Sequence, residues 1–224
     1  MICNPSSAPA RAFIFANGEL PDISALRGLL HPDDWLVAAD GGLHHLQRLG
    51  LIPQLLIGDL DSVLPEEAAA LEQAGVAVRR FAPEKDETDL ELALQAVFQA
   101  GCLEVRIAAG LGGRIDQTLG NLSLLLLPAS TGHPAVDLRF ADGREEVLLI
   151  TTRQSVSGAA GDTLSLIPWL GPARGICTEG LRYPLRGETL WPERTRGISN
   201  ELLGDTASIS LQEGCLLCIH TRKL

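Results

Sequence analysis

The sequence predicts an α/β domain followed by an all-β domain, and three observations carry this prediction. Short apolar runs alternate with helix-like segments up to about residue 142, as in the βα units of a mostly parallel open sheet with helices on both faces. After about residue 143 helical periodicity stops, and short apolar runs separated by Gly and Pro follow. The length of 224 residues allows one large domain or two modest ones. We therefore expect domains at 1–143 and 144–224, the second a small sandwich or, alternatively, a barrel.

The expected elements follow in a regular order. Helices are predicted at 23–30, 43–49, 65–74, 90–100 and 117–127. The T-x-x-E spacing of Thr88 and Glu91 predicts a capping box, which places Asp86 and Asp89 at the N-terminal end of the fourth helix. Strands of the first domain are predicted at AFIFANG, WLVAAD, QLLIGD, AVRRFA, EVRIAAG and VDLRFAD. Strands of the second are predicted at EVLLITT, DTLSLIPW, GICTEGL, TASISL and CLLCIH.

Charge and composition narrow the classes of function. The formal charge is −10, and the acidic excess lies entirely in residues 1–143, with 19 acidic and 9 basic side chains. Without a Lys/Arg run, binding to nucleic acid or to an anionic membrane is disfavoured, so small-molecule partners are expected. No export signal and no membrane span are expected, and the protein is predicted to be cytoplasmic. Five cysteines then indicate reduced thiols, with Cys215 and Cys218 interpreted as packed side chains.

Aspartates recur at the ends of apolar runs in the first domain. Each run is predicted to be a strand buried on both faces, so the carboxylates should emerge where an open α/β sheet forms its ligand crevice. Crowded carboxylates repel, which either raises their pKa values or requires a cation among them, and oxygen ligands near phosphate favour Mg²⁺. Asp59 and Asp61, two apart, are expected to point to the same side of an extended backbone, although a capping turn is the alternative. The residues are Asp40, Asp59, Asp61, Asp86, Asp89 and Asp116.

Two further stretches of the first domain bear on phosphate binding. The run GLGGRIDQ at 110–117 places glycines and Arg114 between a strand and a helix, a composition typical of a turn around phosphate, although such turns also occur without ligands. It fits neither a P-loop nor a dinucleotide-binding pattern. Lys85 is either a phosphate partner or, as we favour from the residue alone, a solvated loop residue.

Polar and aromatic residues in the second domain are less informative. Tyr183 and the turn Ile198-Ser199-Asn200 stand in an otherwise apolar region, where the ordinary interpretations are a core tyrosine and turn chemistry. No Ser or Cys with a plausible His partner supports covalent catalysis.

Six motifs in order resemble one family. They are DGG at 40–42, GDLDS at 58–62, KDETDLELAL at 85–94, GGRIDQTLGN at 112–121, GLRYPL at 180–185 and ISNEL at 198–202. Each alone is weak, but together they run through nearly the whole chain. On these residues the chain resembles the thiamine pyrophosphokinase family, the ATP:thiamine diphosphotransferases.

The resemblance implies an α/β ATP-binding catalytic domain at 1–143 and a β-sandwich thiamine-binding and dimerisation domain at 144–224. It implies a homodimer that transfers the pyrophosphoryl group of MgATP to thiamine, giving thiamine diphosphate and AMP. The alternatives are a kinase or pyrophosphokinase acting on another small alcohol, such as a pterin or a thiamine precursor, and a non-catalytic nucleotide or thiamine sensor. TLWPERTRG at 189–197, which includes Trp191, departs from the family pattern.

The resemblance also implies a role for each site residue. The Mg²⁺ ligands would be Asp59, Asp61 and Asp89, and the catalytic residues Arg114, Asp40 and Asp116, with either aspartate as general base. ATP would contact Lys85, Thr88, Gly112, Gly113 and Arg114. Thiamine would contact Tyr183, Ser199 and Asn200.

Overall fold

The structure is a computed structural model that describes residues 9–223. Contacts within the chain divide it into two compact units, with the boundary between Gly143 and Arg144. Each unit has its own hydrophobic core. Among the residues described, no helix is long and apolar enough to cross a membrane.

The first unit is built on six parallel strands. Every neighbouring pair is parallel, and the order across the sheet is β6-β5-β1-β2-β3-β4. The chain moves outward from β1 through β4 and then returns to the other side of β1, so the direction of winding reverses between β1 and β5. In open α/β sheets this reversal opens a crevice at the carboxyl ends of the strands. The strands are β1 (Arg11–Phe15), β2 (Trp35–Ala39), β3 (Leu55–Gly58), β4 (Ala77–Arg80), β5 (Glu104–Ala108) and β6 (Asp137–Ala141).

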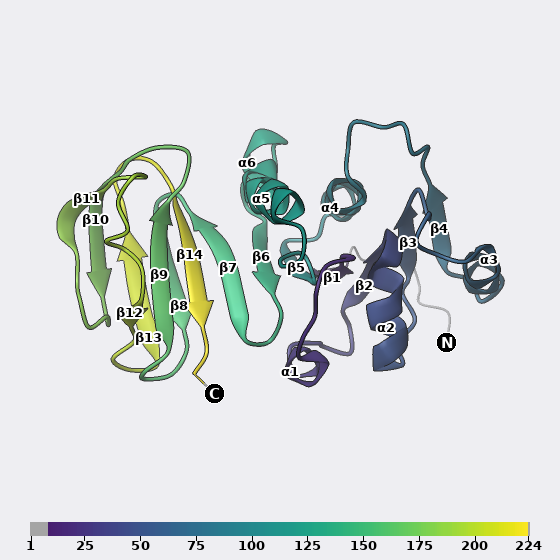
Figure 1. Cartoon of the computed structure of the whole chain (residues 1–224), viewed down its shortest axis with the longest axis horizontal. Coiled ribbons are helices and arrows are strands. Elements are labelled where there is room, and N and C mark those ends of the chain that lie inside the picture. Colours follow the sequence, from purple (N-terminus) through teal and green to yellow (C-terminus); the bar gives the residue numbers. More distant parts are fainter. Residues whose placement is uncertain (1–8, 224) are drawn as a thin grey trace. The chain divides into compact units, whose positions relative to one another are not determined.

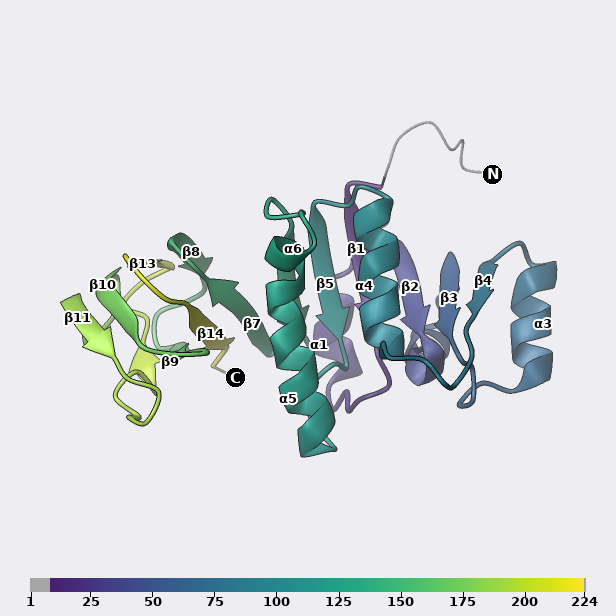
Figure 2. The same cartoon turned by 90° about the horizontal axis from the view of Figure 1, so that it is seen from above.

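Helices cover both faces of this sheet, as the sequence predicts. In both views α4, α5 and α6 lie on one face, while α1 and α2 lie on the other (Figures 1 and 2). The helix expected at 117–127 is confirmed only as far as Ser123, and its expected continuation to residue 127 is wrong. Pro128 cannot donate to the carbonyl of residue 124, and a 3₁₀ turn interrupts the α-helix there. The helices are α1 (Ile23–Arg27), α2 (Leu43–Leu49), α3 (Pro65–Gln73), α4 (Asp89–Gln99), α5 (Ile115–Ser123) and α6 (Leu127–Ser130), with 3₁₀ turns η1 (Asp40–Gly42) and η2 (Leu124–Leu126).

The strands differ in how deeply they are buried. β3 is buried along its whole length and β1 and β2 nearly so, which explains their continuous apolar runs. The expectation that the run before Asp86 is buried on both faces is wrong. β4 is the edge strand, and its Ala77, Arg79 and Arg80 are exposed. Charged side chains on an edge strand oppose pairing with another chain.

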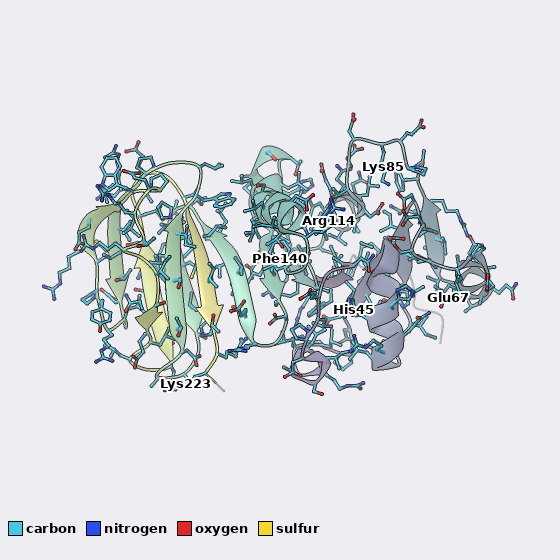
Figure 3. The ribbon with its side chains drawn as sticks, viewed as in Figure 1. His45, Glu67, Lys85, Arg114, Phe140 and Lys223 are labelled. Atoms are coloured by element: carbon cyan, nitrogen blue, oxygen red, sulfur yellow. The ribbon has the colours of Figure 1, made fainter. Side chains whose placement is uncertain are left out.

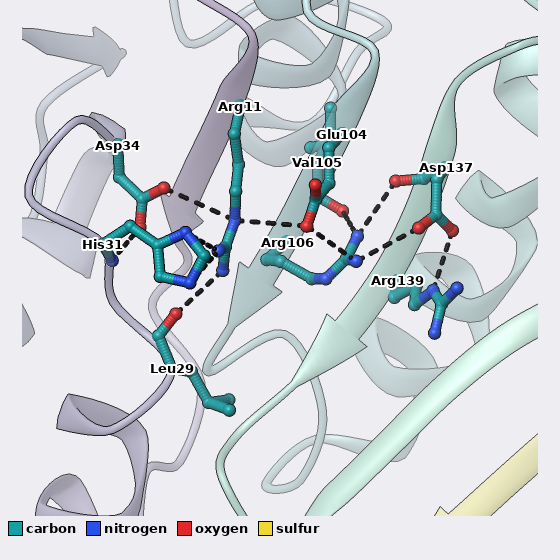
Figure 4. Close-up of polar contacts among 9 residues, drawn as sticks. All are labelled: Arg11, Leu29, His31, Asp34, Glu104, Val105, Arg106, Asp137 and Arg139. Carbon is teal, nitrogen blue, oxygen red and sulfur yellow. Dashed lines mark hydrogen bonds and ion pairs between the residues drawn. The ribbon is translucent and has the colours of Figure 1, made fainter. Parts of the chain in front are cut away.

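A chain of ion pairs crosses the amino-terminal edge of the same sheet (Figure 4). The Arg11 guanidinium contacts both Asp34 and Glu104 at 3.4 Å. Arg106 then connects Glu104, at 2.9 Å, to the start of β6. These ion pairs connect the beginnings of β2, β1, β5 and β6. Asp40 and Asp59 lie at the opposite end of the strands, after the carboxyl ends of β2 and β3.

The second unit is a sandwich of two antiparallel sheets. One has the order β12-β9-β14-β7 and the other β11-β10-β13-β8, and side chains from both sheets form one apolar core. This confirms the sandwich rather than the barrel. The strands are β7 (Glu145–Ile150), β8 (Arg153–Ser157), β9 (Thr163–Pro168), β10 (Ala173–Glu179), β11 (Arg186–Leu190), β12 (Asn200–Glu201), β13 (Thr206–Ser210) and β14 (Leu216–Thr221).

Three strands of the sandwich are missing from the sequence prediction. They are β8, β11 and β12, and all three lie at an edge of their sheet. Their sequences RQSVS, RGETL and NE are mostly polar, and each strand is largely exposed or half-buried. Edge strands of this kind carry little apolar signal, so the pattern of hydrophobic residues does not reveal them.

Candidate active site

A cavity of about 600 Å³ opens at the carboxyl ends of the strands in the first unit. Its lining comes from the segments that follow β5, β1, β2 and β3 and from the segment before α4. The volume lies within the usual range for small-molecule sites, and the position is the crevice that the reversal of strand order predicts. Of the sequence-predicted site residues, the lining includes Asp40, Asp59, Asp61, Lys85, Thr88, Asp89, Gly112, Gly113 and Arg114.

Three of the aspartates converge in this cavity. Asp40, Asp59 and Asp89 each offer a carboxylate oxygen, and these oxygens lie within 4.8 Å of one another. They come from three different segments, after β2, after β3 and at the first turn of α4. Such an all-oxygen group matches the ligands that Mg²⁺ prefers.

The structure places Asp61 apart from this group. Asp61 lines the cavity, but among the described residues its oxygens do not join the three that meet. The expectation that Asp59 and Asp61 share one side of an extended backbone is wrong. Leu60 between them has φ +62°, and the Asp61 N–H donates to Asp59 Oδ1 at 3.2 Å, so the segment is a turn. Asp86 is exposed and lies outside the cavity lining.

Lys85 lies among the carboxylates. Its Nζ is 3.0 Å from Asp59 Oδ2 and 3.1 Å from Asp89 Oδ1, and its side chain is 12% exposed. The interpretation of Lys85 as a solvated loop residue is therefore wrong. The hydrogen bond from Lys85 lowers the pKa of Asp59, whereas burial, reinforced by the neighbouring Asp59 and Asp40 charges, raises the pKa of Asp89. The site thus holds one carboxylate that ionises readily and one that ionises at a cost.

Asp40 is held in an unusual backbone conformation. Its φ is +45°, its side chain is buried, and its Oδ1 accepts from the Ser62 N–H at 3.3 Å. Gly42 is required beside it, because a Cβ there would come within 1.9 Å of the Phe15 carbonyl oxygen at the end of β1. Among the described residues, five non-glycine positions have positive φ; three of them, Asp40, Leu60 and Ala109, lie in or beside the cavity. Strain concentrated in this way is typical of functional sites.

The glycine-rich turn forms another wall of the cavity. Gly112 and Gly113 have φ of +89° and +71°, and the turn leads directly into α5. Arg114 stands at its end (Figure 3), 73% exposed on its side chain, and its guanidinium makes a two-point contact with the Asp116 carboxylate. Asp116 is outside the cavity lining, so of the two candidate bases Asp40 is the one that faces the cavity.

The N-terminus of α4 is capped as the sequence predicts, but only in one direction. Thr88 Oγ1 accepts from the Glu91 N–H at 3.2 Å, which confirms Thr88 as the cap. The Glu91 carboxylate instead accepts from Gln95 one turn later, so the reciprocal half of the capping box is wrong. Thr88 and Asp89 both line the cavity, where the helix end is electropositive.

Several polar residues of the cavity are absent from the sequence prediction. Gln117 and Asn121 lie four apart on α5 and face the cavity together, a helical spacing that the motif GGRIDQTLGN contains. Asn17 donates to Ser62 Oγ, which in turn donates to Asp61. The amides and the hydroxyl carry no charge, so the pattern of charged residues does not mark them, and Glu19 does not belong to any of the aspartate motifs. The full set is Asn17, Glu19, Ser62, Gln117 and Asn121.

The second unit brings together the residues that the family resemblance assigns to thiamine binding. The Asn200 side chain makes two hydrogen bonds to the backbone of Tyr183. Its Oδ1 accepts from the Tyr183 N–H at 3.0 Å, and its Nδ2 donates to the Tyr183 carbonyl at 2.8 Å. Tyr183 is 62% exposed, so the core interpretation of this residue is wrong. Ser199, next to Asn200, has φ +60°, and its N–H donates to Ser165 Oγ.

Family models match both units of the chain. A model described as thiamin pyrophosphokinase, catalytic domain, matches residues 26–136, and one described as thiamin pyrophosphokinase, vitamin B1 binding domain, matches residues 149–216. Together they account for most of the sequence. The chain belongs to the thiamine pyrophosphokinase family. Membership in this family makes the protein an enzyme of thiamine diphosphate formation.

Individual members of the family are similar over nearly the whole chain. The thiamine pyrophosphokinase of Bacillus subtilis is 28% identical over 210 residues, which are 93% of this chain and 97% of that protein. Its crystal structure superimposes with a TM-score of 0.83 at 27% identity, covering 96% of this chain and all of the other. The crystal structure of the thiamin pyrophosphokinase of Geobacillus thermodenitrificans gives 0.80 at 27% identity, covering 95% and 98%.

Proposed function

We propose that this family member transfers the pyrophosphoryl group of MgATP to the hydroxyl of thiamine and releases AMP. The single observation that carries the proposal is the meeting of Asp40, Asp59 and Asp89 in a cavity that also contains the glycine-rich turn and Arg114. Carboxylates for a divalent cation and a backbone turn for phosphate are the two parts that phosphoryl transfer from a nucleotide requires. The reaction then asks mainly for positioning and for neutralisation of charge.

The residues fit Mg²⁺. Asp40, Asp59 and Asp89 supply hard oxygen donors close enough to share one ion. Asp61 lines the same cavity. The buried Asp89 Oδ1 has no hydrogen-bond donor in favourable geometry among the described residues, and its contact is the ion pair to Lys85. When bound, Mg²⁺ neutralises phosphate oxygens and orients them. The set Asp59, Asp61 and Asp89 implied by the resemblance remains a prediction beside the set that the geometry favours.

The chain's own residues would handle the polyphosphate and the proton. The backbone of Gly112 and Gly113 and the N-terminal turn of α4 at Thr88 bind phosphate oxygens. Arg114 exchanges its surface contact with Asp116 for the phosphate, since a guanidinium binds phosphate at two points as it binds carboxylate. The thiamine oxygen attacks the β-phosphorus as the bond from that phosphorus to the oxygen of the departing AMP breaks. Asp40 offers one oxygen to the ion, and its other carboxylate oxygen would accept the hydroxyl proton.

Thiamine binding belongs to the second unit in this proposal. Tyr183 offers an exposed ring, and Asn200 fixes its backbone with two hydrogen bonds. The match of residues 149–216 to a vitamin B1 binding domain supports this assignment. Two copies of the chain would form the active homodimer, with the second unit as the dimerisation domain.

One reaction tests the proposal. Purified protein is incubated with MgATP and thiamine, and thiamine diphosphate and AMP are expected in equal amounts. ADP with thiamine monophosphate, or turnover only with a pterin or a thiamine precursor, would support a different kinase. Tight binding of nucleotide or thiamine without any product in Mg²⁺ would support a sensor and contradict the proposal.

A further inference from the structure

The Lys85 ammonium lies beside the cluster of carboxylates that is the candidate metal site. The ammonium lies 3.0 Å from Asp59 and 3.1 Å from Asp89, two of the three carboxylates whose oxygens meet. With 12% of its side chain exposed, Lys85 is enclosed among these acids and is not a surface partner of either. It comes from the segment between β4 and α4, one residue before the exposed Asp86.

The charges in this cluster do not balance. The cluster contains three carboxylates and one ammonium, which contacts two of them, so it keeps an excess of negative charge that a divalent cation would reduce. Both cations need the same oxygens, because Lys85 Nζ contacts Asp59 and Asp89 directly. A lysine ammonium is a compact charge on a flexible four-carbon stem, which lets it leave such a site without a change of the backbone.

We infer that Lys85 is an exchangeable counter-ion, which holds the carboxylates together when no metal is bound and gives way when a divalent cation enters. Its ammonium then turns into the cavity and becomes a partner for the polyphosphate of the nucleotide. The inference rests on the proposed function of the cavity. An exchangeable Lys85 and a fixed structural ion pair predict opposite effects on metal affinity. Removal of an exchangeable Lys85 should strengthen metal binding, whereas removal of a fixed pair would loosen the carboxylates and weaken metal binding.

Metal affinity tests the exchange without any turnover. Mn²⁺ alone is titrated into the protein, and free Mn²⁺ is followed by its electron paramagnetic resonance signal. Lys85→Met removes the competing charge and should tighten Mn²⁺ binding on the order of tenfold, while Lys85→Arg should remain near wild type. Lys223→Met, which changes the only other lysine of the sequence, is the matched control and should have no effect. Equal or weaker binding by Lys85→Met would overturn the exchange.

A second measurement uses the unmodified sequence. Because the chain contains only two lysines, protein labelled with ¹³C,¹⁵N-lysine gives two resolvable sets of side-chain signals. Addition of Mg²⁺ should shift the Cε and Nζ signals of Lys85 and leave those of Lys223 in place. Metal binding with unchanged Lys85 signals would overturn the exchange and leave the metal site standing. If the wild-type protein binds no divalent cation at all, the metal site of the proposed function fails, and the exchange fails with it.

Discussion

Gly58 at the end of β3 packs directly against Asp89 at the start of α4. A Cβ on Gly58 would lie 3.0 Å from both the carboxyl carbon and Oδ1 of Asp89, and the φ of Gly58 is +146°. Gly58→Ala should therefore push the carboxylate out of place and strain the backbone. We expect turnover to fall about 100-fold and stability to fall by about 1–3 kcal/mol, measured by steady-state kinetics and urea unfolding.

Gly120→Ala is the matched control for this change. Gly120 lies inside α5, and a Cβ there would meet nothing within 4 Å. Alanine at a helical position of this kind should stabilise the protein by about 0.5–1 kcal/mol and leave turnover unchanged. An equal loss of activity in both variants would show that the contact between Gly58 and Asp89 is not the cause.

Asp89→Asn should separate activity from stability. Burial raises the pKa of Asp89, so keeping this carboxylate ionised costs free energy in the folded protein. The neutral amide removes that cost, and the Tm without metal should stay at or above that of the wild type. Turnover should nevertheless fall by a factor on the order of 100 or more, because a carboxylate of the cluster is lost. Full activity in this variant would contradict the metal assignment.

Much of the fold could be predicted because its strands are buried on both faces. The runs FIF, LVAA and LLIG are continuous apolar segments, and they become β1, β2 and β3. The helix at Leu43–Leu49 is also predicted to the residue, with Gly50 in the left-handed conformation after it. The edge strands β8, β11 and β12 were not predicted, and the burial of the edge strand β4 was predicted wrongly. Side chains on an edge strand are largely exposed to solvent, so they need not be apolar.

The candidate site could be predicted as a region but not as a geometry. Aspartates at strand ends follow from the alternation of apolar runs, whereas the choice of Asp40 over Asp61 depends on the left-handed Leu60. The local sequence does not predict the positive φ of Leu60. The position of Lys85 between Asp59 and Asp89 is likewise a long-range result, because it requires the segments after β3 and before α4 to meet.

Asn200→Ala should act on thiamine more than on chemistry. The side chain of Asn200 makes two hydrogen bonds to the Tyr183 backbone, so its loss should free the exposed ring of Tyr183. We expect KM for thiamine to rise about tenfold with a smaller change in kcat. Asn200→Asp keeps the acceptor for the Tyr183 N–H and loses the donor to its carbonyl, so its KM should be intermediate. An unchanged KM in both variants would remove Tyr183 and Asn200 from the thiamine site.

Thiol reactivity should follow burial. Cys102 is 1% exposed and burial raises its pKa to about 11, while Cys177 is exposed. Cys215 and Cys218 are buried, and burial also raises the pKa of Cys215. Iodoacetamide at pH 8 should therefore modify Cys177 first among these four, as peptide mapping can establish. Rapid modification of Cys215 or Cys218 in the folded protein would contradict their interpretation as packed thiols.

Asp162 should make the stability of the protein depend on pH. This carboxylate is 3% exposed and accepts from the N–H groups of Ala159 and Lys223 and from His220 Nε2, at 3.0, 2.9 and 2.8 Å. Burial alone would raise its pKa, but these donors outweigh burial and the pKa is lowered. A lowered folded pKa means that the stabilisation is complete above the unfolded pKa of about 3.9 and is lost as pH falls through the folded pKa.

The variant Asp162→Asn tests this dependence. It should lower the free energy of unfolding by about 2 kcal/mol at pH 7, because buried donors lose a charged acceptor. The difference from wild type should shrink below about pH 4, as the wild-type carboxylate itself becomes protonated. Urea unfolding across this range measures both, with Glu213→Gln as a control at a surface ion pair where the carboxylate is 74% exposed. A difference that persists undiminished in acid would mean that Asp162 stabilises the sandwich through its shape and not through its charge.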